Sequence, residues 1–157
     1  ILKTRYGEVN LKGYIDRVDA KDGVVRIIDY KTGSGSLEFK DWSDLFSHEP
    51  ESKKQAPHVL QTLLYGYLYK QKTQLKQIIP AIIYTKHIFN QDFSPLIVYK
   101  PEINTQQVID NYFDVEKDFL SGLTSCIEEI FDPEIPFQQT QLHDNCKYCD
   151  FKNICNR

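Results

Sequence analysis

The chain has 157 residues, the size of one domain, and a formal net charge of −3. This weakly acidic balance argues against a free-standing nucleic-acid binder, whose basic surface normally supplies phosphate affinity, unless a DNA-binding neighbour tethers the domain. No apolar run approaches the roughly 20 residues that span a bilayer, and no signal-peptide pattern is present, so we expect a cytoplasmic protein. Because the chain lacks methionine and begins inside an apparent strand, we expect it to be a piece of a longer protein.

The N-terminal part of the chain has the pattern of β-strands. Residues 1–9 and 11–19 alternate between apolar and polar side chains, which predicts two strands with a turn near Asn10. Residues 21–23 (Lys-Asp-Gly) are typical of a hairpin turn, and the β-branched run 24–30 predicts a largely buried third strand.

A long loop and a helix follow. Residues 33–54 are polar and contain aromatic side chains, and Pro57 suits the first turn of a helix. The spacing of the next apolar residues predicts a helix that faces the core through Leu60, Leu63, Leu64, Tyr67 and Leu68.

The second half of the chain predicts more strands and another helix. Residues 78–88 and 94–99 are rich in β-forming side chains, and Pro80 suggests that the first of these strands begins near an edge. Asn104 with Gln107 resembles a capping box, which would begin a helix that continues through Val108, Tyr112, Val115 and Phe119 and ends at Asp132-Pro133. We therefore expect an α/β fold.

Carboxylates stand at the ends of two neighbouring strands. Asp29 and Lys31 are two residues apart, so strand geometry puts their side chains on one face, about 6–7 Å apart along it. Hairpin pairing would bring Asp16 beside Asp29, and two such carboxylates are typical ligands of a hard divalent cation. A plain Asp29–Lys31 surface pair is the alternative, but it does not account for the apolar residues around them. Asp19 and Asp22 are better interpreted as edge and turn residues.

Gln61 and Tyr65 lie four residues apart on the predicted helix, so they share one face next to its apolar stripe. An amide and a phenol there would orient a substrate phosphate or a metal-bound water. The alternative is that Gln61 and Tyr65 are ordinary polar residues on a helix surface, with no role in a site.

The C-terminal tail contains three closely spaced cysteines, Cys146, Cys149 and Cys155. This spacing favours a soft-metal or cluster site over disulfides. Three thiolates are one ligand short of a tetrahedral zinc site or a four-iron cluster. Cys126 and His143 are other candidates, but we expect the fourth ligand to lie outside this chain.

Together, these motifs resemble the RecB-like branch of the PD-(D/E)XK nucleases, which includes AddB-type helicase-nuclease subunits and iron–sulfur CRISPR-associated exonucleases. The matching segments are Gly-Tyr-Ile-Asp-Arg-Val-Asp at 13–19, Ile-Asp-Tyr-Lys-Thr-Gly at 28–33, Gln61 with Tyr65, and the three cysteines. The resemblance implies a restriction-endonuclease-like core, a central mixed β-sheet flanked by helices. It also implies a single nuclease domain over residues 1–157, with the cysteine-rich tail 133–157 packing on that core.

The resemblance also implies roles for individual residues. Asp16, Asp29 and the backbone carbonyl of Tyr30 would bind Mg²⁺ or Mn²⁺, and Lys31 would be the catalytic lysine. Gln61 and Tyr65 would belong to the motif behind the site. The three tail cysteines would hold a [4Fe–4S] cluster. The expected partners are DNA and a helicase domain or subunit, in DNA repair or recombination.

Two departures and two alternatives accompany this interpretation. Relatives carry an upstream helical segment with a further catalytic residue and the first cluster cysteine, so this chain would cleave weakly or not at all alone. One alternative is a nuclease-fold DNA-binding or structural module without cleavage activity. The other is a zinc-ribbon-like interaction protein that uses the three tail cysteines and His143.

The loop aromatics Phe39, Trp42 and Phe46 also have two interpretations. They would stack on single-stranded bases or close the core over the sheet, and packing is the more usual role of aromatics near a strand end.

Overall fold

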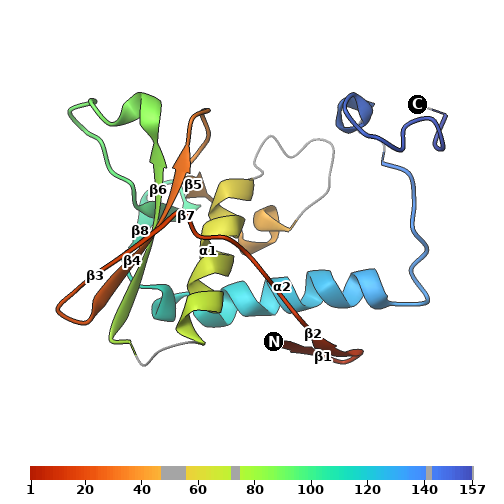
Figure 1. Ribbon diagram of the computed structural model, residues 1–157, viewed down its shortest axis with the longest axis horizontal. Helices are drawn as coiled ribbons and strands as arrows, with labels where there is room; N and C mark the ends of the chain where they lie inside the picture. The colour runs from red at the N-terminus through yellow and green to blue at the C-terminus, as the bar shows by residue number, and fades with distance from the viewer. Residues whose placement is uncertain (47–55, 72–74, 141–142, 157) are drawn as a thin grey trace.

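The computed structural model describes residues 1–46, 56–71, 75–140 and 143–156. It confirms the expected α/β class, because small mixed and antiparallel sheets are flanked by two helices, α1 (Pro57–Lys70) and α2 (Glu116–Phe131) (Figure 1). Among the described residues, no helix combines the length and apolar character needed to cross a membrane.

The central sheet contains three strands in the order β3 (Arg17–Lys21), β4 (Val24–Lys31) and β6 (Gln77–Tyr84). β3 pairs antiparallel with β4, and β4 pairs parallel with β6, so the sheet is mixed as expected. The predicted hairpin turn is confirmed, because Asp22 and Gly23 adopt the positive φ angles of 54° and 81° that a two-residue turn needs.

A second sheet continues beside β6, with the strand order β5 (Glu38–Phe39), β7 (Ile97–Glu102) and β8 (Thr105–Ile109). Ala81 of β6 forms an isolated antiparallel bridge with Leu96, and the Ile82 N–H donates to the Pro95 carbonyl at 2.9 Å. These contacts link the two sheets at the middle of β6.

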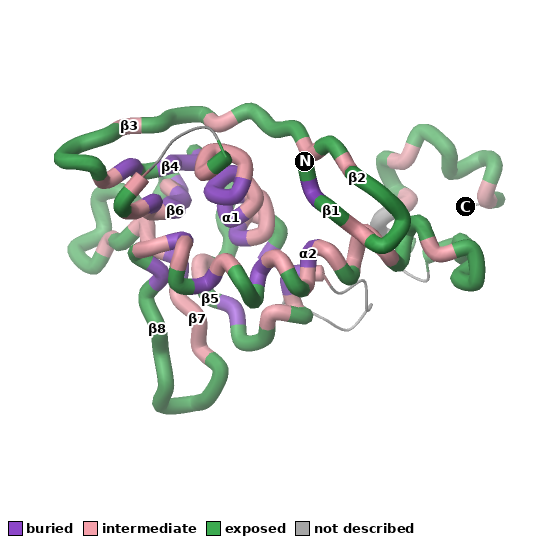
Figure 2. The backbone as a smooth tube through the Cα atoms, turned by 90° about the horizontal axis from the view of Figure 1, so that it is seen from below, coloured by how far each residue is buried: buried purple, intermediate pink, exposed green. Residues whose placement is uncertain are grey.

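The helix α1 makes the crossover between the parallel strands β4 and β6 and packs against both. Pro57 is at its N-terminal turn, as predicted. Val59, Leu63 and Ile78 are completely buried between helix and sheet. Figure 2 shows buried backbone concentrated at α1, β4 and β6, whereas the C-terminal segment is mostly exposed.

The N-terminal prediction is wrong in detail, because residues 1–9 form a small hairpin of their own. β1 (Leu2–Thr4) pairs with β2 (Gly7–Val9), and Gly7 has a φ of 120° that allows the tight turn. Residues 11–15 are not in a strand, and β3 begins only at Arg17.

The predicted helix at Asn104 is also wrong. Residues 105–109 instead form β8, which pairs antiparallel with β7, and α2 begins at Glu116. The polar cap forms later, where the Asn111 side chain accepts from the Phe113 N–H at the short 3₁₀ turn η3 (Tyr112–Asp114). Sheet pairing thus overrides a local capping pattern.

The loop aromatics pack, as expected. Phe39 is 2% exposed and stacks on Tyr99 at 5.0 Å between ring centroids, and Trp42 meets both rings. Phe46 contacts Phe119 of α2. Residues 47–54 of the expected loop lie outside the described residues.

Candidate active site

Asp29 and Lys31 occupy the C-terminal end of β4, the middle strand of the central sheet. Asp29 is 2% exposed, and Lys31 Nζ lies 2.8 Å from Asp29 Oδ2. That approach lacks hydrogen-bond geometry, so Oδ2 is buried without a hydrogen bond among the described residues. A buried carboxylate in this state depends on one ion pair to offset its desolvation.

Asp16 stands at the corresponding point of the neighbouring chain segment. The last pair of the β3–β4 register is Arg17 with Ile28. Asp16 comes immediately before β3, so extending this register by one residue sets it opposite Asp29. Its Oδ2 accepts a hydrogen bond of 2.9 Å from the Tyr30 N–H. Unlike the sequence interpretation, which placed it inside an apolar alternation, Asp16 is exposed, because residues 11–15 run outside the ladder.

Gln61 and Tyr65 reach the same place from α1. Lys31 Nζ donates to Gln61 Oε1 at 2.7 Å, and Gln61 Nε2 donates to the Tyr65 hydroxyl at 2.7 Å. Tyr65 is 6% exposed and its ring lies against Gly13, where an added Cβ would come within 2.6 Å of Cε1. The structure therefore brings Lys31, Gln61 and Tyr65 into one hydrogen-bonded row.

His58 and Tyr84 belong to this neighbourhood, and the sequence interpretation missed both. Their Nδ1 and hydroxyl groups form a hydrogen bond of 2.7 Å, and Tyr84 pairs with Lys31 across the β4–β6 ladder. Burial, and then the positive charge of Lys31, lower the pKa of His58, while Asp29 opposes this effect. Burial, and then the charge of Asp29, raise the pKa of Tyr84. The sequence pattern that indicates a place for His58 near the site is its position three residues before Gln61, on the same side of the helix.

The other acidic residues of the hairpin are structural. Both oxygens of Asp19 accept from Arg26, at 2.8 and 2.9 Å, and these hydrogen bonds lower the pKa of Asp19. Asp22 forms part of the hairpin turn, where its φ is 54°. Both therefore match their predicted edge and turn roles.

The tail cysteines lie far along the chain from this row. Cys146, Cys149 and Cys155 are free thiols of intermediate exposure in a segment that Figure 1 shows beyond the end of α2, apart from the sheet. Cys126 lies within α2, where burial raises its pKa. The predicted packing of the tail on the core and the predicted cluster both stay predictions.

The carboxylates at the end of β4 have the chemistry of a magnesium site. No group of three or more histidine, cysteine, aspartate or glutamate residues gathers in metal-binding proximity within the described part of the chain. Mg²⁺, however, commonly uses only one or two carboxylates and keeps several waters. The buried carboxylate of Asp29, whose Oδ2 is paired with Lys31 and which lies opposite Asp16, fits that need.

A family model of the PD-(D/E)XK nuclease superfamily matches residues 2–156. The chain belongs to this superfamily. No curated protein and no solved structure matches it. PD-(D/E)XK proteins are usually metal-dependent nucleases, and the match covers both the acidic strands and the tail cysteines of this member. It places the chain in the superfamily but not in one of its branches.

Proposed function

We propose that this PD-(D/E)XK domain hydrolyses phosphodiester bonds of DNA with Mg²⁺ or Mn²⁺ at Asp16 and Asp29. The observation that carries the proposal is the buried Asp29 carboxylate, whose Oδ2 contacts Lys31 alone among the described residues and which lies opposite Asp16. A carboxylate used only for structure would be expected to accept hydrogen bonds at both oxygens.

Three groups would hold the cation: the carboxylates of Asp16 and Asp29 and the backbone carbonyl of Tyr30. When bound, a divalent cation polarises a phosphoryl oxygen and lowers the pKa of a bound water. Asp29 would supply negative charge to the cation from its buried position in the core. Asp16 supplies it from the exposed side, where substrate would arrive.

Lys31 is the residue that would meet the phosphate or the attacking water. Its ammonium is paired with Asp29 and also donates to Gln61, and the Gln61 contact would keep it at the site when a cation takes over its pairing with Asp29. Gln61 in turn is fixed by Tyr65. These contacts would hold one positive charge at the point where negative charge develops in the transition state.

The finer assignment rests on the sequence. We infer a RecB-like nuclease module of a helicase-nuclease or exonuclease, with a helicase domain or subunit as partner and a role in DNA repair or recombination in the cytoplasm. Cys146, Cys149 and Cys155 would bind a [4Fe–4S] cluster with a fourth ligand from outside the chain. The order and spacing of four motifs support this assignment.

A second candidate is a nuclease-fold DNA-binding or structural module without cleavage. One observation favours it: Asp29 is paired with Lys31, and Asp16 is engaged by the Tyr30 N–H. A site of this kind would first have to release Lys31 from Asp29 in order to act.

The test is cleavage of end-labelled DNA in Mn²⁺ by the protein assembled with the helicase domain or subunit that the proposal gives it as a partner. We expect Asp29→Asn and Lys31→Ala each to lose roughly 100-fold or more of the rate. Asp19→Asn is the matched control, because this carboxylate lies on the same hairpin but is bound to Arg26. Full activity in either site variant would falsify the residue assignment. Binding of DNA without cleavage by the wild type would favour the second candidate.

A further inference from the structure

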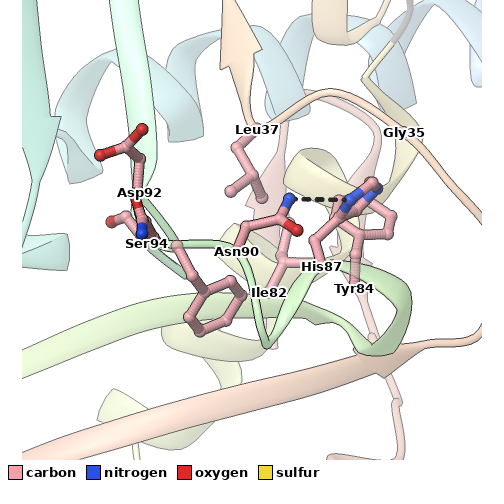
Figure 3. Close-up of a pocket in the computed structure, with 10 residues that line it drawn as sticks. Gly35, Leu37, Ile82, Tyr84, His87, Asn90, Asp92 and Ser94 are labelled. Atoms are coloured by element: carbon pink, nitrogen blue, oxygen red, sulfur yellow. Dashed lines mark hydrogen bonds between the residues drawn. The ribbon is translucent and has the colours of Figure 1, made fainter.

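A cavity of about 620 Å³ opens beside the proposed active site. It lies between the end of β6, the segment 85–95 that follows, and residues 35–37 after β4 (Figure 3). Figure 3 shows Leu37 and Ile82 together with Tyr84, His87 and Asn90 around this cavity. None of the proposed catalytic residues lines it.

The cavity shares a wall with the active site. Tyr84 lines it, pairs with Lys31 across the ladder, and is hydrogen-bonded to His58. Thr85 Oγ1 donates to the Lys31 carbonyl at 3.3 Å. Gly35 allows this close packing, because a Cβ there would lie 2.1 Å from the Tyr84 hydroxyl. A group seated in the cavity would therefore be a near neighbour of a phosphate at Lys31.

The lining has the chemistry of a base-binding pocket. Phe93 and His87 supply aromatic rings to the lining, and Leu37 and Ile82 supply aliphatic side chains. Asn90, Gln91, Asp92 and Ser94 supply hydrogen-bonding groups. No lysine or arginine is among the described lining residues, and one carboxylate is. This lining repels phosphate but suits the edge of a nucleobase, which donates and accepts hydrogen bonds.

We propose that this cavity, resting on the proposed nuclease function, binds one nucleobase of the substrate strand next to the scissile phosphodiester. The base stacks on the ring of Phe93 or His87, as bases stack on aromatic platforms in other single-strand binders. The Asn90 amide pairs with its polar edge. Its contact with His87 Nδ1, at 3.5 Å, is long enough to be exchanged for a base. The pocket would position the strand and give the enzyme a base preference.

The test is titration of the full chain with deoxynucleoside 5′-monophosphates, observed by NMR in the presence of EDTA. Deoxyribose 5-phosphate is the probe that lacks a base. We expect the four nucleotides to shift the backbone amides of residues 87–94 and the sugar phosphate to leave them unshifted. Phe93→Ala should weaken nucleotide binding roughly tenfold, in line with the loss of one stacked base.

Phe89→Ala is the matched control, because Phe89 lies in the same segment, is 92% exposed and does not line the cavity. Its nucleotide affinity should equal that of the wild type. Asn90→Ala is a second pocket variant that leaves the aromatic rings in place, and unchanged spectra outside residues 85–95 would show that each variant is folded.

Three results would overturn the base pocket: equal shifts from deoxyribose 5-phosphate, no shift with any nucleotide, or equal losses in Phe89→Ala and Phe93→Ala. These readouts need neither metal nor cleavage. A failure of the pocket would therefore leave DNA cleavage in Mn²⁺ intact, whereas a failure of the nuclease function would appear as absent cleavage with nucleotide binding retained.

Discussion

At the scale of single residues, the site depends on how Asp29 is neutralised. A carboxylate that is 2% exposed carries a large desolvation cost, and the Lys31 ammonium at 2.8 Å offsets it in the structure. The same pairing explains why two charged groups persist at the end of a strand whose other inward residues are apolar. A divalent cation would take over this neutralisation and release Lys31 for the substrate.

This view predicts the stability of Lys31→Met. The variant leaves a buried charge without its cation, so we expect the free energy of unfolding to fall by about 3 kcal/mol. Adding Asp29→Asn to the same chain should restore part of the loss, because the uncompensated charge is gone. Urea unfolding of the wild type, the single variants Lys31→Met and Asp29→Asn, and the double variant measures this. Additive losses in the double variant would show that the two residues are not coupled.

A second prediction concerns pH. The lowered pKa of His58 means that the unfolded chain binds this proton at a higher pH than the folded chain. The contribution of His58 to stability is therefore complete above the unfolded pKa of about 6.5 and is lost as pH falls through the lower folded value.

His58→Gln should consequently show a smaller loss of unfolding free energy between about pH 7.5 and about pH 5 than the wild type. Chemical denaturation at several pH values checks this. An identical pH dependence in both proteins would show that His58 is not the group responsible.

At the scale of elements, the sequence was most informative where local chemistry and tertiary packing agree. The β3–β4 hairpin is confirmed because Asp22 and Gly23 suit a turn with positive φ, and α1 because Pro57 precedes a regular apolar stripe. The sequence did not predict β8. The Asn104–Gln107 pattern favours a helix on local grounds, whereas these residues pair with β7 as a strand. The pairing partner of β8 lies in β7, which no local pattern reveals.

The same limit applies to the site. Strand and helix periodicity was enough to group Asp29 with Lys31 and Gln61 with Tyr65. These two pairs meet because α1 packs on β4, and no local sequence pattern predicts that packing. Tyr84 was missed for this reason, since only the parallel β4–β6 register brings it to Lys31.

A prediction at this scale concerns the contact between α1 and η3. A Cβ at Gly66 would lie 2.8 Å from Cδ2 of Tyr112, whose ring is fully buried. We expect Gly66→Ala to lower the free energy of unfolding by about 1–3 kcal/mol, the usual cost of overpacking a core. Gly33→Ala is the control, because its Cβ would have no neighbour within 4 Å. Thermal unfolding compares the two, and equal stability would contradict the tight helix contact.

At the scale of the whole molecule, the C-terminal segment is distinct from the rest. Tyr148, Phe151 and Ile154 are 87%, 67% and 80% exposed, and Figure 1 shows the segment apart from the sheet. Apolar side chains that are this exposed favour an interaction that covers them. The proposed cluster would tie the three cysteines of this segment together.

We therefore expect Cys149→Ser to lower iron content and stability before it alters catalysis. Metal analysis of the purified variant and wild type measures iron and zinc per chain. Cys126→Ser is the matched control, because this thiol belongs to α2. Normal iron content in Cys149→Ser would exclude the cluster, and one zinc without iron would support the zinc-ribbon alternative.

The central claim is that Asp16 and Asp29 form one metal centre with Lys31 beside it. Anomalous diffraction from crystals of the chain soaked in Mn²⁺ tests it most directly. We predict one peak within bonding distance of both carboxylates, with Lys31 turned away from Asp29. The absence of a peak, with Lys31 still paired with Asp29 and Asp16 still bound to the Tyr30 N–H, would contradict it.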